Sequence, residues 1–142
     1  MKIISNIIEL HIYKIVQNEP QFLLLKRSEK EIYPGIWQMV SGKIRKGEKA
    51  YNAAKRELME ETGLIPISFD VVPIVNSFYS CNNDSVCMVP VFVCEVKSET
   101  EVKISDEHTD FQWVSPEIAK SLLAWDGQRR AVDVILNHFL KK

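Results

Sequence analysis

The sequence is short of cysteine and of net charge, and each shortage excludes a class of protein. Its three cysteines are an odd number without a Cys-x-x-Cys spacing, which indicates neither a disulfide framework nor a zinc site and favours a reducing compartment. The formal net charge of -1 gives no general attraction to nucleic acid or to a membrane surface. We therefore expect no nucleic-acid partner.

A long apolar run is lacking as well. No stretch approaches the roughly 18 residues that a membrane-spanning helix needs. Residues 1–14 are partly apolar, but Asn6, Glu9 and Lys14 interrupt them and no small-residue cleavage site follows, so they do not predict a signal peptide. We expect a cytoplasmic protein without a membrane partner, and the sequence leaves open a homodimer.

What is present is the composition of one globular domain, which we expect to span residues 1–142. Of these residues 46% are hydrophobic and 26% are charged, which is enough apolar material for one core. Alternating apolar side chains over residues 8–13 predict a strand with one buried face. A turn at residues 17–20 is expected to connect it in a hairpin to a second strand at residues 21–27.

The rest of the chain adds strands on both sides of one long helix. Residues 66–80 and 86–96 predict two strands joined by a hairpin loop, with Pro73 and Pro90 indicating edge positions or bulges. The other expected elements are a short strand at 36–41, a strand at 111–114, a helix at 116–123 begun by Ser115 and a last helix at 127–139 capped by Asp126. This order of strands, helix, strands and helices predicts one mixed sheet with helices packed on it.

The long helix, predicted over residues 48–62, carries an unusual row of charge. Its last turns hold Glu57, Glu60 and Glu61 before Gly63, which suits a left-handed C-cap. Carboxylates at positions i, i+3 and i+4 lie on one face of a helix and repel one another unless a positive charge lies among them. We interpret this face as a divalent-metal site, and a solvated acidic surface is the alternative.

A wider pattern surrounds these glutamates. Gly42 is followed after five residues by Glu48, and after seven more by the run Arg56-Glu57-Leu58-Met59-Glu60-Glu61-Thr62-Gly63-Leu64. The pattern matches the Nudix box at every defined position, and the chain therefore resembles the Nudix hydrolase family. The resemblance implies an α/β/α sandwich, an α/β (α+β) fold with a mixed sheet. It also implies Mg²⁺- or Mn²⁺-dependent hydrolysis of a phosphoanhydride bond in a nucleoside diphosphate linked to another group.

The resemblance also implies roles for the box residues. Glu57, Glu60 and Glu61 are expected to ligate the metal, with one of the glutamates activating water instead. The Gly42 carbonyl is expected to complete the coordination. Arg56, together with Glu48, is expected to orient the glutamates and the loop.

Members of the family often supply another carboxylate from a later loop, and here that loop is Ser105–Asp110 (SDEHTD). We expect Glu107 to be a metal ligand or a base, with Asp106 as the second choice and an ordinary polar loop as the alternative. His108 is a further candidate for acid–base work, since the unperturbed pKa of histidine is near neutral.

Substrate-binding candidates lie on both sides of the box. Phosphate contacts are expected from Lys26, Arg27 and Lys43, which carry positive charge. A base can stack on the aromatic faces of Trp37 or Tyr79. Solvated lysines and core packing of Trp37 are the plainer alternatives.

Two segments outside the box narrow the substrate. Residues 37–42, and residues 107–114 followed by 125–129, resemble the bacterial branch that cleaves dATP or dihydroneopterin triphosphate to a monophosphate and pyrophosphate. Dinucleoside polyphosphate hydrolases share a similar Glu-His loop and are the alternative within the family. A non-catalytic, nucleotide-binding regulatory domain is the alternative from another class, and the retained glutamates argue against it. In each case the partner is a nucleotide or a related small molecule that contains a diphosphate.

Overall fold

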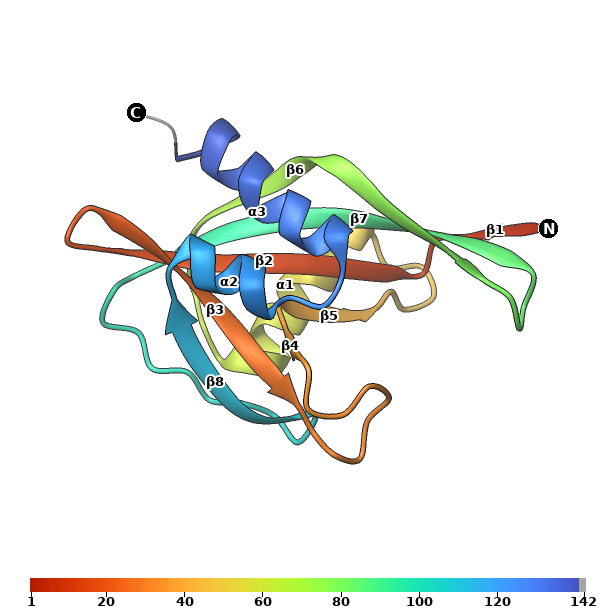
Figure 1. Ribbon diagram of the computed structural model, residues 1–142, viewed down its shortest axis with the longest axis horizontal. Coiled ribbons are helices and arrows are strands. Elements are labelled where there is room, and N and C mark those ends of the chain that lie inside the picture. Colours follow the sequence, from red (N-terminus) through yellow and green to blue (C-terminus); the bar gives the residue numbers. More distant parts are fainter. Residues whose placement is uncertain (141–142) are drawn as a thin grey trace.

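A mixed β-sheet lies between helix α1 on one face and helices α2 and α3 on the other, as seen in a computed structural model that describes residues 1–140 (Figure 1). This arrangement confirms the α/β/α sandwich. Within the described residues the strands are β1 (Lys2–Ile4), β2 (Ile7–Val16), β3 (Glu19–Arg27), β4 (Trp37–Gln38), β5 (Val40–Lys43), β6 (Pro66–Ser80), β7 (Ser85–Val96) and β8 (His108–Val114). The helices are α1 (Ala50–Thr62), α2 (Pro116–Leu122) and α3 (Asp126–His138).

Strand β2 is the centre of the sheet. It pairs with β7 in parallel on one side, and on the other side first with β5 and then with β3, both antiparallel. Strand β6 pairs with β7, and β8 pairs with β3. Strands β5 and β3 follow one another along the same edge of β2. Because both are antiparallel to β2, they run in the same direction.

Both faces of β2 are buried, whereas its alternating pattern predicted one buried face. Ile8 and Leu10 pack with Ala53 and Leu58 of α1 in one core. Tyr13, on the opposite face, packs in a second core under α2 and α3. The polar residues of that face are buried because helices from the far end of the chain cover it, which local alternation does not report.

The two predicted hairpins are confirmed, with changes in detail. Gln17 and Asn18 form the first turn with positive φ angles of 52° and 65°, so β3 already begins at Glu19 and Pro20 lies within the strand rather than in the turn. The second hairpin joins β6 and β7 and stands out from the body of the molecule beside β1 (Figure 1). The register of this pair shifts between Val71 and Val75, which places the predicted bulge around Pro73.

Several element boundaries differ from the sequence predictions, including the start of α1, which is Ala50 rather than residue 48. The strand expected at 36–41 is split into β4 and β5, which pair with different neighbours. Strand β8 begins at His108, three residues before the expected start. Pro90 lies in the central strand β7 opposite Val75, at the register shift, so of the two predicted alternatives it is the bulge that is confirmed. Asp126 does not cap α3: it is the first helical residue, after Trp125, and bonds to Arg129.

The remaining expectations are simpler. Ser115 caps α2 as predicted, with its Oγ accepting a hydrogen bond from the backbone of Ile118. The three cysteines are free. Within residues 1–140, no helix has both the length and the apolar character needed to cross a membrane.

Candidate active site

Helix α1 brings the glutamates to the edge of the sheet. It ends at Gly63, whose φ of 69° is left-handed and whose N–H donates to the Met59 carbonyl, so the chain can turn away sharply. Glu57 and Glu61 are buried on the side of α1 that faces the sheet, whereas the side chain of Glu60 is 45% exposed. The shared face predicted for the three glutamates is therefore divided into two inward carboxylates and one outward carboxylate.

The glycine of the loop makes room for Glu57. A Cβ atom at position 42 would lie 2.5 Å from Oε1 of Glu57, well inside van der Waals contact. Gly42 is the third residue of β5 and pairs with Ile8 of β2. A side chain at position 42 would therefore push the carboxylate away from the sheet, which explains why the pattern needs glycine there.

Arg56 holds the carboxylates in fixed positions. Its Nε and Nη2 donate to both oxygens of Glu48 at 2.9 Å, and Nη2 also donates to the Lys43 carbonyl at 2.9 Å. Its Nη1 donates to Glu57 at 2.8 Å and to Glu60 at 3.1 Å. A guanidinium in a fixed fork of this kind fixes geometry as well as charge.

These contacts change the acid strengths of the partners. Hydrogen bonds from Arg56, and then from the backbone of Arg45, lower the pKa of Glu48 to about 2. The bond to Glu48 is likewise the main cause that raises the pKa of Arg56. Burial raises the pKa of Glu57 against the opposing effect of Arg56. Glu48 thus serves as the permanent counter-charge of Arg56, while Glu57 is less firmly ionised.

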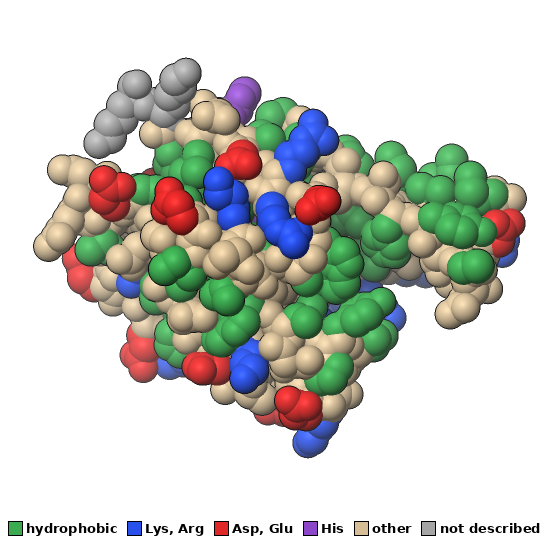
Figure 2. All heavy atoms as spheres, viewed as in Figure 1, with side chains coloured by type: hydrophobic (Ala, Val, Ile, Leu, Met, Phe, Trp, Pro, Cys, Tyr) green, Lys and Arg blue, Asp and Glu red, His purple; other side chains and the backbone are tan. Residues whose placement is uncertain are grey.

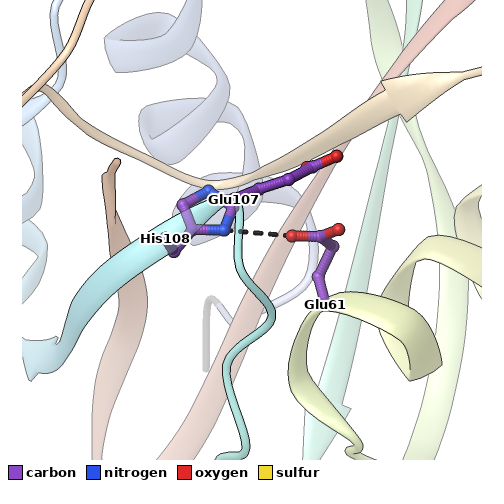
Figure 3. Close-up of side chains that lie close together, drawn as sticks. All are labelled: Glu61, Glu107 and His108. Atoms are coloured by element: carbon purple, nitrogen blue, oxygen red, sulfur yellow. Dashed lines mark ion pairs between the residues drawn. The ribbon is translucent and has the colours of Figure 1, made fainter. Parts of the chain in front are cut away.

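A second group of side chains meets Glu61 from the acidic loop. Ser105 Oγ donates to Glu61 Oε2 at 2.9 Å. His108 Nδ1 lies 3.0 Å from the same oxygen, with the ring N–H not well aligned for a hydrogen bond (Figure 3). The other ring nitrogen of His108 lies 3.0 Å from Nε2 of Gln38 on β4. His108 is therefore held from both sides.

A bulge in the sheet puts this loop in place. The pairing of β3 with β8 shifts between Lys26 and Arg27, so that Arg27 opposes His108 while Lys26 opposes Asp110. Bulges of this kind redirect side chains next to functional sites. The backbone N–H of Ser28 donates to the Glu107 carbonyl at 2.9 Å, which fixes the residue before the strand.

The group has an excess of negative charge. Loss of solvent around the carboxyl group, followed by the charge of Glu61, raises the pKa of Glu107 to about 7, although the residue as a whole is exposed. Burial alone would raise the pKa of Glu61, but contacts with His108 and Ser105 lower it overall. Two carboxyl groups that oppose each other's ionisation in this way are stabilised by a cation between them.

The residues present fit a hard divalent cation. One ligand atom from each of Glu61, Glu107 and His108 lies within 4.8 Å of the others, and Glu57 adds its charge to the same group. Carboxylate oxygens suit Mg²⁺ or Mn²⁺, which keep waters and bind substrate phosphates as further ligands. The protein can thus gather a cation and a phosphate chain at the end of α1.

A cleft of about 690 Å³ includes Gln38, the residue that contacts His108, among its lining residues. Arg27, Gln38 and Ser41 line it, and so do the aromatic residues Phe78 and Trp125. A volume of this size is typical of a small-molecule site. Figure 2 shows the projecting β6–β7 arm, rich in hydrophobic side chains, standing off from the body of the molecule.

The structure brings only some of the predicted substrate-binding residues to this cleft. Arg27 and Tyr79 line it; Arg27 Nε donates to the Ile32 carbonyl at 2.6 Å, and the Tyr79 hydroxyl donates to Asp84 at 2.7 Å. Lys26, Trp37 and Lys43 are not among its lining residues. Trp37 packs instead against the core under α2 and α3.

Among the polar lining residues that were not predicted as site residues are Glu9 on β2, Asn76 on β6 and Gln128 on α3. Glu9 carried one available signal, an acidic residue inside an apolar strand. Its alternation with apolar neighbours placed it on a solvent face, and only the packing of α3 reveals that this face is buried.

Comparisons with known proteins agree with this geometry. The model of the NUDIX domain matches residues 10–135 of the chain. A curated relative, nucleoside triphosphatase NudI of Escherichia coli O139:H28, is 28% identical over 111 residues, which cover 72% of this chain and 79% of the relative.

Two solved structures share the fold. A C. elegans Ap4A hydrolase, in a binary complex, superposes with a TM-score of 0.80 at 21% identity, covering 96% of this chain and 97% of that one. The E. coli dihydroneopterin triphosphate pyrophosphohydrolase superposes with a TM-score of 0.74 at 22% identity, covering 89% and 91%. At these identities the likeness concerns the fold alone.

Proposed function

Because the chain belongs to the NUDIX family and is a hydrolase of that family, we propose that it converts a nucleoside or pterin triphosphate to the monophosphate and pyrophosphate. The observation that carries the proposal is the meeting of Glu61, Glu107 and His108 within 4.8 Å, next to Gln38, which contacts His108 and lines the cleft. The relative NudI is named a nucleoside triphosphatase, which favours a triphosphate over other diphosphate compounds.

We assign the metal to the glutamates of α1 and the acidic loop. Glu57, Glu60, Glu61 and Glu107, with the Gly42 carbonyl, are the proposed holders of Mg²⁺ or Mn²⁺. When bound, such an ion neutralises phosphate charge and lowers the pKa of a bound water. Glu60 forms ion pairs with Arg45 and Arg56 at 3.2 and 3.1 Å. To bind the metal ion it would release these arginines, and its exposed position allows that change of partner.

The side chains around the ion then have separate tasks. Arg56 keeps Glu57 against Gly42, and His108 with Ser105 keeps Glu61 in one orientation. Glu107 is the proposed acceptor of the proton of the attacking water, through the carboxylate oxygen that is not used as a ligand. The water oxygen forms a bond to phosphorus, the phosphoanhydride bond breaks, and pyrophosphate leaves with the bonding electron pair. Phosphoryl transfer of this type depends mainly on such positioning and charge stabilisation.

The test is a panel of substrates with Mg²⁺ and product identification. It should contain the dNTPs, the NTPs, dihydroneopterin triphosphate, diadenosine tetraphosphate and ADP-ribose. A monophosphate plus pyrophosphate from a triphosphate supports the proposal; release of ATP from diadenosine tetraphosphate as the preferred reaction would replace it. Turnover in ¹⁸O-labelled water then identifies the attacked phosphorus, because the label enters the monophosphate after attack at the α-phosphorus and the pyrophosphate after attack at the β-phosphorus.

A further inference from the structure

A carboxylate lies buried in the cleft, away from the glutamates of α1. Glu9 is only 8% exposed, and it accepts hydrogen bonds from Asn76 Nδ2 at 2.6 Å and from Gln128 Nε2 at 3.0 Å. Among residues 1–140 it forms no ion pair. A carboxylate removed from water and held only by neutral amides is costly, so a ligand that supplies further donors would stabilise it.

The unused hydrogen-bonding capacity at this point consists of acceptors. A carboxylate oxygen can accept two hydrogen bonds, and each Glu9 oxygen receives one from an amide. Because the amide nitrogen of Gln128 is bound to Glu9, its Oε1 is left over, and this atom is buried without a partner. Gln128 is 7% exposed and lines the cleft beside Glu9. Glu9 and Gln128 are therefore short of hydrogen-bond donors, which a ligand in the cleft can supply.

The position of these residues is tightly set. Asn76 lies so close to the start of α3 that a Cβ atom at Gly127 would be 2.7 Å from its Oδ1. The absence of a side chain at position 127 lets Asn76 reach Glu9 under the helix. The three elements β2, β6 and α3 meet at this point.

The walls of the cleft near this point are aromatic and exposed. Phe78 is 53% exposed on the β6 side, and Trp125 is 45% exposed at the start of α3. Tyr33 contacts Trp125 edge to face, with 5.3 Å between the ring centroids. Exposed aromatic faces are suited to stacking on a flat ring, so the cleft combines flat walls with the acceptors of Glu9 and Gln128.

We propose that Glu9 and Gln128 select substrates whose ring carries a 2-amino-4-oxopyrimidine edge, the edge shared by guanine and pterin. On this edge a ring N–H and an exocyclic amine point the same way and match the two oxygens of one carboxylate. The second hydrogen of the exocyclic amine can donate to Gln128 Oε1. The inference rests on the proposed function, in which the triphosphate lies beside Glu61 and Glu107.

Other common rings fit these acceptors less well. Adenine and cytosine place a ring nitrogen lone pair beside their amine, and thymine flanks its N–H with two carbonyl oxygens. Each would set a lone pair against the Glu9 carboxylate. A buried acceptor that is left without a donor weakens binding strongly. Substrates with adenine, cytosine or thymine should therefore bind less tightly than those with the guanine or pterin edge.

The sharpest test changes one amine and leaves the enzyme intact. dITP differs from dGTP only by the missing 2-amino group. We expect kcat/KM for dITP to be about tenfold or more below that for dGTP, mainly through KM, because ring contacts are made in the ground state as well as the transition state. Equal values for the two substrates would overturn the inference.

A panel then identifies which ring carries the edge. dGTP and dihydroneopterin triphosphate should exceed dATP, dCTP and dTTP in kcat/KM by about 10- to 100-fold, as paired hydrogen bonds to a base discriminate. Whichever of dGTP and dihydroneopterin triphosphate has the larger kcat/KM shows whether guanine or pterin is the preferred ring. A preference for dATP or dTTP overturns the inference while leaving triphosphate hydrolysis, and hence the proposed function, in place.

Binding without turnover separates the two proposals further. In EDTA, calorimetry should show tighter binding of dGMP than of dIMP by wild-type protein. Glu9→Gln should remove that difference, whereas Glu19→Gln, a change at an exposed glutamate at the start of β3, should keep it. An unchanged preference in a folded Glu9→Gln variant would sink the assignment, and absence of turnover with every Mg²⁺-bound triphosphate would sink the proposed function instead.

Discussion

The carboxylate of Glu57 lies directly against the backbone of Gly42, where a Cβ atom would be 2.5 Å from Oε1. The strand β5 and the helix α1 are therefore in contact through a residue without a side chain. Arg56 completes the contact by donating to Glu57 at 2.8 Å and to the Lys43 carbonyl at 2.9 Å. One arginine thus links the helix glutamates to the loop that faces them.

Gly42→Ala is expected to abolish most of the activity. The added methyl group must displace the Glu57 carboxylate and weaken its bond to Arg56, and overpacking of this kind costs about 1–3 kcal/mol of stability. We expect kcat to fall by about 100-fold or more, with weaker Mg²⁺ binding by calorimetry. A folded variant with wild-type kcat and Mg²⁺ affinity would show that Glu57 has no role in the metal site.

The sequence predicted the box because its information is local. Gly42, Arg56 and Glu57 lie within one loop and one helix, so a short sequence pattern identifies them, and the family resemblance implied their roles. The Glu9 group could not be predicted in the same way, because its partners are 67 and 119 residues away. His108 was expected in the acidic loop, but it is the first residue of β8. The bulge at Lys26 and Arg27 lets β8 begin earlier than its apolar pattern suggests.

Glu60→Gln should separate catalysis from folding. Glu60 is half-exposed and its partners are Arg45 and Arg56, and exposed ion pairs contribute roughly 0–1 kcal/mol. We expect kcat to fall by about 100-fold or more while the melting temperature stays near that of wild type. Glu117→Gln, a change at an exposed residue in the first turn of α2, is the matched control and should retain activity. Near-normal turnover under Mg²⁺ would remove Glu60 from the metal site.

Removal of the metal should stop the reaction. The carboxylate group has an excess of negative charge that the triphosphate would increase, so the substrate cannot approach it without a cation. Excess EDTA is expected to abolish hydrolysis, and Mg²⁺ or Mn²⁺ added beyond the chelator should restore it. Hydrolysis that continues in EDTA would contradict the mechanism.

Glu107→Gln should change the pH dependence as well as the rate. The pKa of Glu107 is raised to about 7 in the metal-free protein, so the folded state holds a proton between pH 4.5 and 7 that the unfolded chain has released. Stability of the metal-free protein therefore falls as pH rises through this window, and Mg²⁺ binding near pH 6.5 should release protons. Calorimetry in buffers of different ionisation enthalpy measures that release.

The Glu107→Gln variant is expected to lose the released proton and to turn over more slowly. The neighbouring change Asp106→Asn provides the control, since Asp106 lies outside the group that meets Glu61. Wild-type kinetics and undiminished proton release in Glu107→Gln would exclude Glu107 as ligand and as base.

His11 should make the whole fold sensitive to acid. It is 2% exposed, and burial lowers its pKa from 6.5 to about 4. Between these values the unfolded chain binds a proton that the folded protein does not, so stability is full above pH 6.5 and is lost as pH falls toward 4, by up to about 3 kcal/mol. Urea unfolding at pH 7 and pH 5 measures the loss. His11→Leu should remove this part of the pH dependence, whereas His138→Gln, a change at an exposed histidine at the end of α3, should retain it; an equal loss in wild type and His11→Leu would place the acid sensitivity elsewhere.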